Sequence, residues 1–219
     1  MISNSAPPDL TPSIVSPIVA PNLLTEGNPL KLGIMASGSG SNFEAIAQAI
    51  HDGQLNAQIQ VLIYNNPGIK AAARAEKWGV PAVLLNHRDY KRREELDAAI
   101  VEALQKYEVD WVIMAGWMRI VTPVLINAFP NRAINIHPSL LPSFKGVRAV
   151  EQALAAGVKI TGCTVHLVSP DVDSGRILMQ SAVPVLPDDT PETLHARIQI
   201  QEHRILPQAI ALAAAASRC

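Results

Sequence analysis

The regular pattern of this chain begins at residues 31–42, which read KLGIMASGSGSN. An apolar run at 31–36 leads directly into a loop of glycine and serine, and a helical pattern follows from Ser41. Ser41 and Glu44 have the spacing of a capping box, so we expect the helix to begin there and to end near Asp52. A strand, a glycine-rich loop and a helix in this order are typical of an α/β sheet.

The same alternation continues along the chain. Short apolar runs predict strands, and helical patterns separate them. The predicted strands are 58–64, 80–85, 109–114 and 132–136, and the predicted helices are 69–78, 89–106, 123–128 and 147–156. Such alternation implies a mostly parallel twisted sheet with helices on both faces. Two longer strand-like runs, 159–168 and 176–185, then precede a final helix from about residue 191, so we predict that the last strands are partly antiparallel.

Composition limits the domain organisation and the class of partner. With 219 residues and 48% hydrophobic composition, the chain can form one domain at 30–219, and the Pro/Ser-rich segment 1–29 is predicted to be a disordered leader. The net charge of −1 favours neither nucleic acid nor an anionic membrane as a partner. The sequence contains no run of 18 apolar residues, which is about the length that a membrane-spanning helix needs. The two cysteines form no disulfide framework, which suits a reducing cytoplasm.

Residues 132–142 carry the strongest chemical signal, an amide and an imidazole at the end of an apolar strand. Asn135 and His137 are two residues apart, so on a strand their side chains project to the same face. Pro138 cannot continue the hydrogen-bond ladder, which places His137 at the tip of the strand. An amide donor beside a titratable imidazole suits acyl transfer, in which one group stabilises an oxyanion and the other moves a proton.

Three further loops follow predicted strands. If those strands are parallel neighbours, the loops share one rim with this tip, at the carboxyl ends of the strands where ligands of such sheets bind. They are the Gly/Ser loop 37–42, the turn 116–119 and the loop that contains Asp173. The Gly/Ser loop could hold a phosphate through its main-chain amides, although a tight turn needs the same small residues. Asp173 would orient the imidazole if it lies beside His137; otherwise it is a turn-forming residue ahead of a Ser-Gly pair.

Other polar residues give weaker signals. By pattern alone, Gln199 and Glu202 lie on a polar face of the last helix and Arg93 belongs to a charged helix start, and solvent exposure explains both features. The histidines show no HExxH motif or other metal-ligand pair, so we expect no metal site.

Five motifs then combine into a more specific pattern. They are SGSGSN at 37–42, AGWMRI at 115–120, NIHPSLLP at 135–142, DVDSG at 171–175 and QEH at 201–203. In this order they resemble the phosphoribosylglycinamide formyltransferase family over residues 31–209. The resemblance implies a Rossmann-like formyltransferase fold and a reaction of de novo purine biosynthesis. In that reaction the amine of 5-phosphoribosylglycinamide attacks the formyl carbon of the co-substrate 10-formyltetrahydrofolate, and tetrahydrofolate leaves without the help of a bound metal.

The resemblance also implies roles for particular residues. Asn135 stabilises the oxyanion, His137 is the general acid for the departing folate nitrogen, and Asp173 supports the protonated imidazole. The implied ribonucleotide-binding residues are Gly40, Ser41, Asn42, Gln199 and Glu202. The implied folate-binding residues are Arg93, Met118, Arg119, Ile120, Val121, Asn135, Ser169, Pro170, Asp171, Val172 and Asp173. Similar proteins further suggest a cis peptide bond between Leu141 and Pro142.

Two alternatives stay open. A formyltetrahydrofolate hydrolase uses a similar Asn/His/Asp set, but it has an additional N-terminal domain for which the leader is too short. A non-catalytic nucleotide-binding module would use the Gly/Ser loop alone. A methionyl-tRNA formyltransferase would need an extra C-terminal RNA-binding domain, which this sequence does not contain. We therefore expect a cytoplasmic enzyme with two small-molecule substrates and no nucleic-acid or membrane partner, as a monomer or a weak homodimer.

Overall fold

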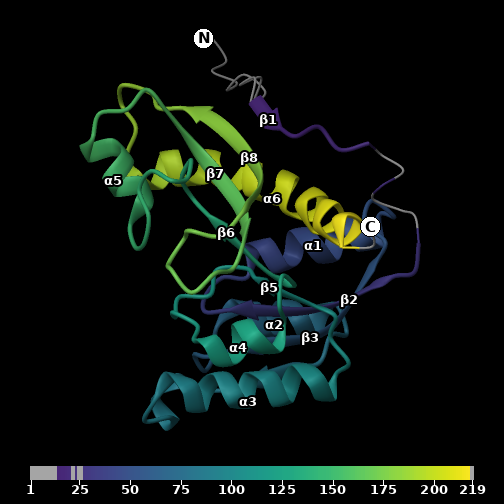
Figure 1. Cartoon of the computed structure of the whole chain (residues 1–219). Coiled ribbons are helices and arrows are strands. Elements are labelled where there is room, and N and C mark those ends of the chain that lie inside the picture. The colour runs from purple at the N-terminus through teal and green to yellow at the C-terminus, as the bar shows by residue number, and fades with distance from the viewer. Residues whose placement is uncertain (1–13, 21–22, 24–26, 218–219) are drawn as a thin grey trace, which may run out of the picture.

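The computed structural model describes residues 14–20, 23 and 27–217. One eight-stranded sheet runs through this part of the chain in the order β1-β8-β7-β6-β5-β2-β3-β4 (Figure 1). Its strands are β1 (Ile14–Ser16), β2 (Leu30–Ala36), β3 (Ala57–Tyr64), β4 (Ala82–Leu84), β5 (Trp111–Met114), β6 (Ala133–His137), β7 (Ile160–Leu167) and β8 (Ile177–Pro184). The helices are α1 (Ser41–His51), α2 (Lys70–Lys77), α3 (Arg93–Lys106), α4 (Pro123–Ala128), α5 (Ala149–Ala155) and α6 (Pro191–Ala216).

The sheet has a parallel part and an antiparallel part. Strands β4, β3, β2, β5 and β6 are parallel to one another. Strands β7, β8 and β1 then continue the sheet in antiparallel pairs. The direction changes between β6 and β7, although α5 connects these two strands, and β8 then pairs with β7 across a loop. The prediction of a mostly parallel sheet with partly antiparallel final strands is confirmed.

Two hydrophobic cores, one on each face, hold the helices against the sheet. In β2, Leu32 and Ile34 are buried on the face that α1, α2, α5 and α6 cover, and Met35 is buried under α3 and α4. This division follows the two-residue period of a strand that is buried on both faces. Figure 1 shows α1 and α6 above the parallel strands β2 and β3, and α3 and α4 below them. The prediction of helices on both faces is confirmed.

The strand order reverses between β2 and β5, and ligands of such sheets bind at this kind of position. The chain first moves outward from β2 to β3 and β4, and then returns to build β5 and β6 on the other side of β2. Hydrogen bonds join the two loops at the reversal: the Ser37 amide donates to the Gly116 carbonyl (3.0 Å), and the Met118 amide donates to the Ser37 hydroxyl (2.9 Å). These bonds fix the Gly/Ser loop beside the turn that follows β5.

Helix α1 begins at Ser41 as predicted, but its capping and the start of α3 differ from the sequence prediction. The N-cap of α1 is Gly40, with φ of 72°, and it makes no side-chain capping bond. The predicted capping box is wrong, because the Ser41 hydroxyl accepts a hydrogen bond from Gln199 and Glu44 forms ion pairs with two cations of α2. Helix α3 begins at Arg93 instead of residue 89, since the chain first makes a 3-10 turn.

The segment predicted to be a disordered leader, residues 1–29, contains a strand. Strand β1 pairs with β8, with Val15 opposite Ser181, and the Val15 side chain packs against the core. For these residues the prediction of disorder is wrong, because the unpaired edge of β8 can bind a short extended segment despite the prolines nearby. The predictions for residues 1–13, 21–22 and 24–26 lie outside the described residues. Within the described part of the chain, no helix has the length and hydrophobicity to cross a membrane.

Candidate active site

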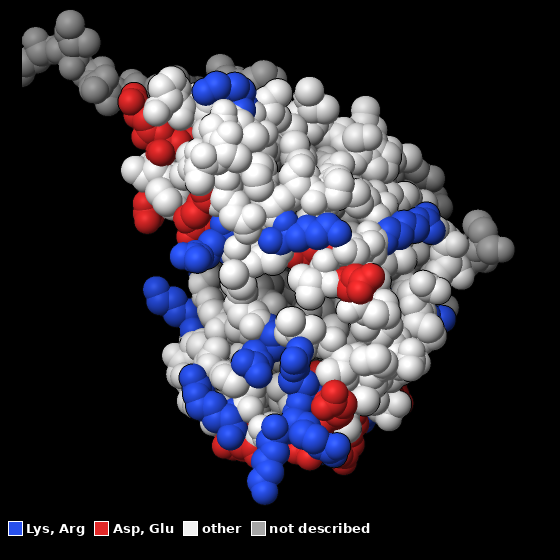
Figure 2. All heavy atoms as spheres, turned by 60° about the vertical axis from the view of Figure 1, so that its left-hand side comes forward, with Lys and Arg blue, Asp and Glu red and all other residues white. Residues whose placement is uncertain are grey.

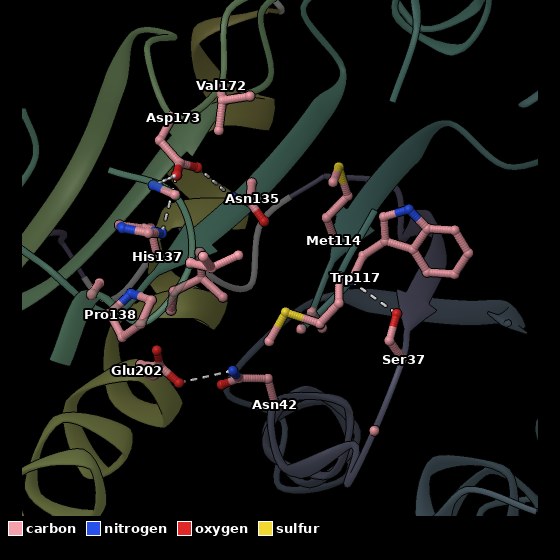
Figure 3. A pocket seen from close by; sticks show the side chains of 18 of the residues that line it. Ser37, Asn42, Met114, Trp117, Asn135, His137, Pro138, Val172, Asp173 and Glu202 are labelled. Atoms are coloured by element: carbon pink, nitrogen blue, oxygen red, sulfur yellow. Dashed lines mark hydrogen bonds and ion pairs between the residues drawn. The ribbon is translucent and has the colours of Figure 1, made fainter. Parts of the chain in front are cut away.

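A cavity of about 730 Å³ lies at the carboxyl ends of the parallel strands. The Asn135–His137 strand tip and the three predicted loops all contribute to its wall (Figure 3). It is lined by residues of 37–42, 114–121, 135–138, 146–151 and 168–173, together with His166 and the cavity face of α6. The space-filling view in Figure 2 shows a face that is hollowed near its middle, with Lys and Arg side chains gathered below the hollow. The predicted common rim is therefore confirmed.

His137 and Asp173 meet at the centre of this wall. The imidazole Nδ1 lies 3.3 Å from Asp173 Oδ2, and the two side chains are only 7% and 9% exposed. The other ring nitrogen, Nε2, lies 2.8 Å from the Phe144 carbonyl oxygen. Both neighbours are acceptors, so the two contacts together suit an imidazole that carries a proton on each nitrogen. Spacing along the chain could not show that these residues meet, because 36 positions separate them.

The environment of Asp173 favours its ionised form. Burial alone would raise the pKa of this carboxyl group, but the contact with His166, the hydrogen bond from the Gly146 amide (2.8 Å) and the charge of His137 outweigh burial and lower the pKa. A carboxylate beside an imidazole favours the imidazolium form and orients the ring. The pair is therefore arranged to hold a proton next to the cavity.

Asn135 completes the cluster through its amide group. As expected from the two-residue period, its side chain is on the same side of the sheet as His137, and both line the cavity. The amide nitrogen lies 3.2 Å from His166 Nε2 and 3.4 Å from Asp173 Oδ1. Figure 3 shows the amide oxygen on the side away from Asp173.

The Gly/Ser loop forms the opposite wall. The Ser41 hydroxyl accepts a 2.9 Å hydrogen bond from Gln199 Nε2, which joins the start of α1 to α6 across 158 positions. Position 40 requires a glycine for two reasons. Its φ of +72° is strained for other residues, and a Cβ there would lie 2.7 Å from the Cβ of Ala71. The loop therefore packs closely on α2, and its main-chain amides and the start of α1 suit an anion.

A buried carboxyl group stands behind this loop. Glu202 is 5% exposed and accepts a 3.0 Å hydrogen bond from Asn42 Nδ2. Burial raises the pKa of Glu202, and the bond from Asn42 opposes this shift only in part. The Asn42 oxygen is buried without a hydrogen-bond partner. Both residues line the cavity, so a polar ligand could bind to this pair.

The predicted folate residues divide into two groups. Ten of the eleven line the cavity, and among them Met118 and Ile120 are apolar yet 77% and 52% exposed. Arg93 does not belong to the lining; it is an exposed residue at the start of α3. The Leu141–Pro142 peptide bond is cis, as the resemblance implied.

Several lining residues escaped the sequence analysis. His166 stands directly opposite Asn135 in the antiparallel pairing of β6 with β7, and only the register of these strands reveals the contact. His195 lies one turn before Gln199 on α6, and Arg148 caps the start of α5. The helical spacing of His195, Gln199 and Glu202 was the one available signal for His195. Among the described residues, no group of three or more His, Cys, Asp or Glu side chains could hold a metal ion.

Comparisons with known proteins show which family the chain belongs to. A family model described as formyl transferase matches residues 30–210. The phosphoribosylglycinamide formyltransferase of Bacillus subtilis is 39% identical over 180 residues, which are 82% of this chain and 92% of that protein. The crystal structure of glycinamide ribonucleotide transformylase 1 from Symbiobacterium toebii superposes with a TM-score of 0.83 at 46% identity, covering 85% of this chain and 88% of that one.

Longer proteins contain a similar segment. The human trifunctional purine biosynthetic protein adenosine-3 is 43% identical over 189 residues, which are 86% of this chain but only 19% of the human protein. This chain therefore spans about a fifth of the length of the trifunctional relatives that it matches. The family model and the relatives of matching length lead to the same conclusion. The chain belongs to the formyl transferase family.

Proposed function

We propose that this protein transfers the formyl group of 10-formyltetrahydrofolate to the amine of 5-phosphoribosylglycinamide, a step of de novo purine biosynthesis. The observation that carries the proposal is the meeting of Asn135, His137 and Asp173 on one wall of a cavity whose opposite wall is the Gly/Ser loop. Relatives of matching length carry the name phosphoribosylglycinamide formyltransferase. A site for acyl chemistry and a site for a phosphate in one cavity suit this pair of substrates.

The proposed reaction uses the three central residues as follows. The substrate amine attacks the formyl carbon, which forms a new C–N bond and turns the formyl oxygen into an oxyanion. The amide N–H of Asn135 stabilises this oxyanion. The bond between the formyl carbon and folate N10 then breaks, and His137 supplies the proton that N10 takes up. The proton that the amine loses restores the imidazolium, and Asp173 stabilises that charge.

We assign the ribonucleotide to the wall formed by Gly40, Ser41 and Asn42. The main-chain amides of this loop and the N-terminus of α1 would bind the phosphate. Gln199 already donates to Ser41 at 2.9 Å, so its amide group lies beside that position. Glu202 would contact the ribosylglycinamide part, which offers hydroxyl and amide groups to a buried carboxyl group.

We assign the folate to the wall formed by 118–121 and 169–173. Exposed apolar side chains such as Met118 and Ile120 suit a flat aromatic ligand better than solvent. Arg119 and the cations gathered below the hollow in Figure 2 suit the carboxylates at the other end of a folate. Because Arg93 lies outside the cavity lining, we assign it only to these outer carboxylates of the folate.

A substrate-dependence assay tests the proposal. The protein is mixed with 10-formyltetrahydrofolate, and tetrahydrofolate formation is followed with and without glycinamide ribonucleotide. We expect turnover only when the ribonucleotide is present. Equal turnover without it would favour the hydrolase, in which water accepts the formyl group. No turnover under either condition, by folded protein, would favour a non-catalytic nucleotide-binding module.

A further inference from the structure

Three successive carbonyl groups of the Gly/Ser loop accept hydrogen bonds from α2 and from the segment that leads into it. The pairs are Ser37 with Asn66 Nδ2 (3.0 Å), Gly38 with the Ala71 amide (3.3 Å) and Ser39 with Arg74 Nε (3.0 Å). The three donors lie outside the cavity lining, whereas the loop itself forms part of that lining. The carbonyl groups are therefore held on the side of the loop that faces away from the cavity.

These bonds decide where the N–H groups of the same peptide units point. A trans peptide unit is planar, and its carbonyl oxygen and its N–H point in opposite directions. The cis peptide bonds of the described chain lie elsewhere, at Ser16–Pro17 and Leu141–Pro142. The N–H groups of Gly38, Ser39 and Gly40 therefore face the cavity side, and no residue that the structure describes accepts a hydrogen bond from them. Successive free amides of this kind suit an anion.

The bond to the Ser39 carbonyl comes from a charged side chain that is itself held in place. Arg74 Nη1 lies 2.9 Å from Oε2 of Glu44, a residue in the first turn of α1. The other oxygen of Glu44 lies 2.8 Å from Lys77 Nζ. The hydrogen bond from Lys77, helped by the one from Arg74, lowers the pKa of Glu44 although burial opposes the shift. The carboxylate therefore stays ionised and fixes the guanidinium between α1 and the loop.

We propose that Arg74 is a positioning residue that fixes the Ser39–Gly40 peptide, so that the Gly40 N–H points into the phosphate site. The inference rests on the proposed function, which assigns the ribonucleotide phosphate to this loop. Glycine adopts positive and negative φ about equally well, so the peptide unit before Gly40 can turn over at little cost. Without Arg74 the turned peptide would present the Ser39 carbonyl oxygen to the phosphate and repel it.

Titration of the native protein with inorganic phosphate tests the geometry without a substitution. In NMR spectra of nitrogen-15-labelled protein, we expect the amide proton signals of Gly38, Ser39 and Gly40 to move downfield, because each N–H gains a charged acceptor. Gly53, which also has positive φ but lies outside the lining of this cavity, is the internal reference and should not move. A Gly40 signal that does not move, or that moves no more than that of Gly53, would overturn the proposal.

Two matched substitutions test the part played by Arg74. Arg74→Met and Lys77→Met each remove one positive charge that is paired with Glu44, but only Arg74 donates to the loop. We expect Arg74→Met to raise the dissociation constant of inorganic phosphate by about 5–10-fold, the scale of one lost hydrogen bond, and Lys77→Met to change it by less than about 2-fold. In steady-state kinetics, Arg74→Met should raise the KM for the ribonucleotide by a similar factor, with kcat and the KM for folate nearly unchanged.

Equal weakening of phosphate binding by both substitutions would trace the effect to charge alone and overturn the proposal. Unchanged phosphate binding in folded Arg74→Met would overturn it as well, and so would parallel losses in kcat and both KM values, which indicate general damage to the structure. Thermal unfolding checks that each variant is folded, and if Arg74→Met is not, the titration of the native protein decides. If the wild-type protein shows no ribonucleotide-dependent turnover, the proposed function fails, and the phosphate titrations still decide whether Arg74 shapes this anion site.

Discussion

Nδ1 of His137 lies 3.3 Å from Oδ2 of Asp173, within a cavity that is also lined by the Gly/Ser loop 37–42. The carboxylate is itself fixed by the Gly146 amide, so the pair has a defined geometry. A buried carboxylate in this position stabilises an imidazolium, the form that would deliver the proton in the proposed reaction.

Removing this carboxylate should therefore slow the chemical step. We expect Asp173→Asn to lower kcat by about 100-fold, the scale of general acid catalysis, with smaller changes in the two KM values. Steady-state kinetics with both substrates measures this. Asp110→Asn, an exposed substitution outside the cavity lining, is the control and should leave kcat unchanged. A normal kcat for Asp173→Asn would remove Asp173 from the mechanism.

Binding of the ribonucleotide should depend on the bond between Gln199 and Ser41. Gln199→Ala removes a side chain that contacts the Gly/Ser loop, the proposed phosphate site, while the reacting groups stay in place. We expect the KM for the ribonucleotide to rise by about 5–10-fold, the scale of one lost hydrogen bond, with kcat and the KM for folate nearly unchanged. Gln105→Ala on α3 is a matched control at an exposed position. A selective rise in the KM for folate would contradict our placement of the two substrates.

Alanine substitutions at Gly40 and Gly53 distinguish the effect of backbone strain from that of close packing. Both have positive φ (+72° and +70°), but a Cβ at Gly40 would meet Ala71 at 2.7 Å, whereas a Cβ at Gly53 would have open space. We expect Gly53→Ala to lower the free energy of unfolding by about 1 kcal/mol through strain alone. Gly40→Ala should cost clearly more and should also weaken ribonucleotide binding. Urea denaturation and KM measurements compare the two, and equal losses would show that the contact with Ala71 is unimportant.

The ion pair between Asp189 and Arg197 should give a pH-dependent contribution to stability. The hydrogen bond from Arg197 is the main cause that lowers the Asp189 pKa to about 2. A pKa that is lower in the folded than in the unfolded state stabilises the protein at pH values above the unfolded pKa. This contribution is lost as the pH falls from about 4 towards 2.

Asp189→Asn should therefore lower the free energy of unfolding by about 1–2 kcal/mol at pH 7, and the difference from the wild type should shrink below pH 4. Urea denaturation at several pH values measures it. Asp52→Asn serves as the control, because Asp52 is an exposed residue at the end of α1. A difference that stays constant down to pH 3 would mean that the ion pair is not its source.

The sequence predicted those parts of the site that depend on local periodicity. Asn135 and His137 share a face because strand side chains alternate, and the Gly/Ser loop follows β2 because its glycine and serine end the apolar run. The layers of the fold follow from the same alternation of apolar strands and helices. The local pattern gave no role to Gln199 and Glu202 of α6 and left Asp173 open; the roles predicted for them came from the family resemblance.

What the sequence could not predict depends on contacts between distant segments. The proximity of Asp173 to His137 and the place of His166 opposite Asn135 follow from the β6–β7 register. The Ser41 hydroxyl does not cap α1, because it accepts a hydrogen bond from Gln199, which lies 158 positions away. Strand β1 was missed for a similar reason, since the edge of β8 and not the local sequence orders it.

The central claim is that this chain moves a formyl group between two bound substrates by means of His137. The most direct measurement follows 10-formyltetrahydrofolate with a carbon-13 formyl group by NMR, in the presence of glycinamide ribonucleotide. For the wild type we predict that the label moves into the formylated ribonucleotide, and for folded His137→Ala that this transfer is at least about 100-fold slower. Label released as formate by the wild type, or transfer at an unchanged rate in the variant, would contradict the account.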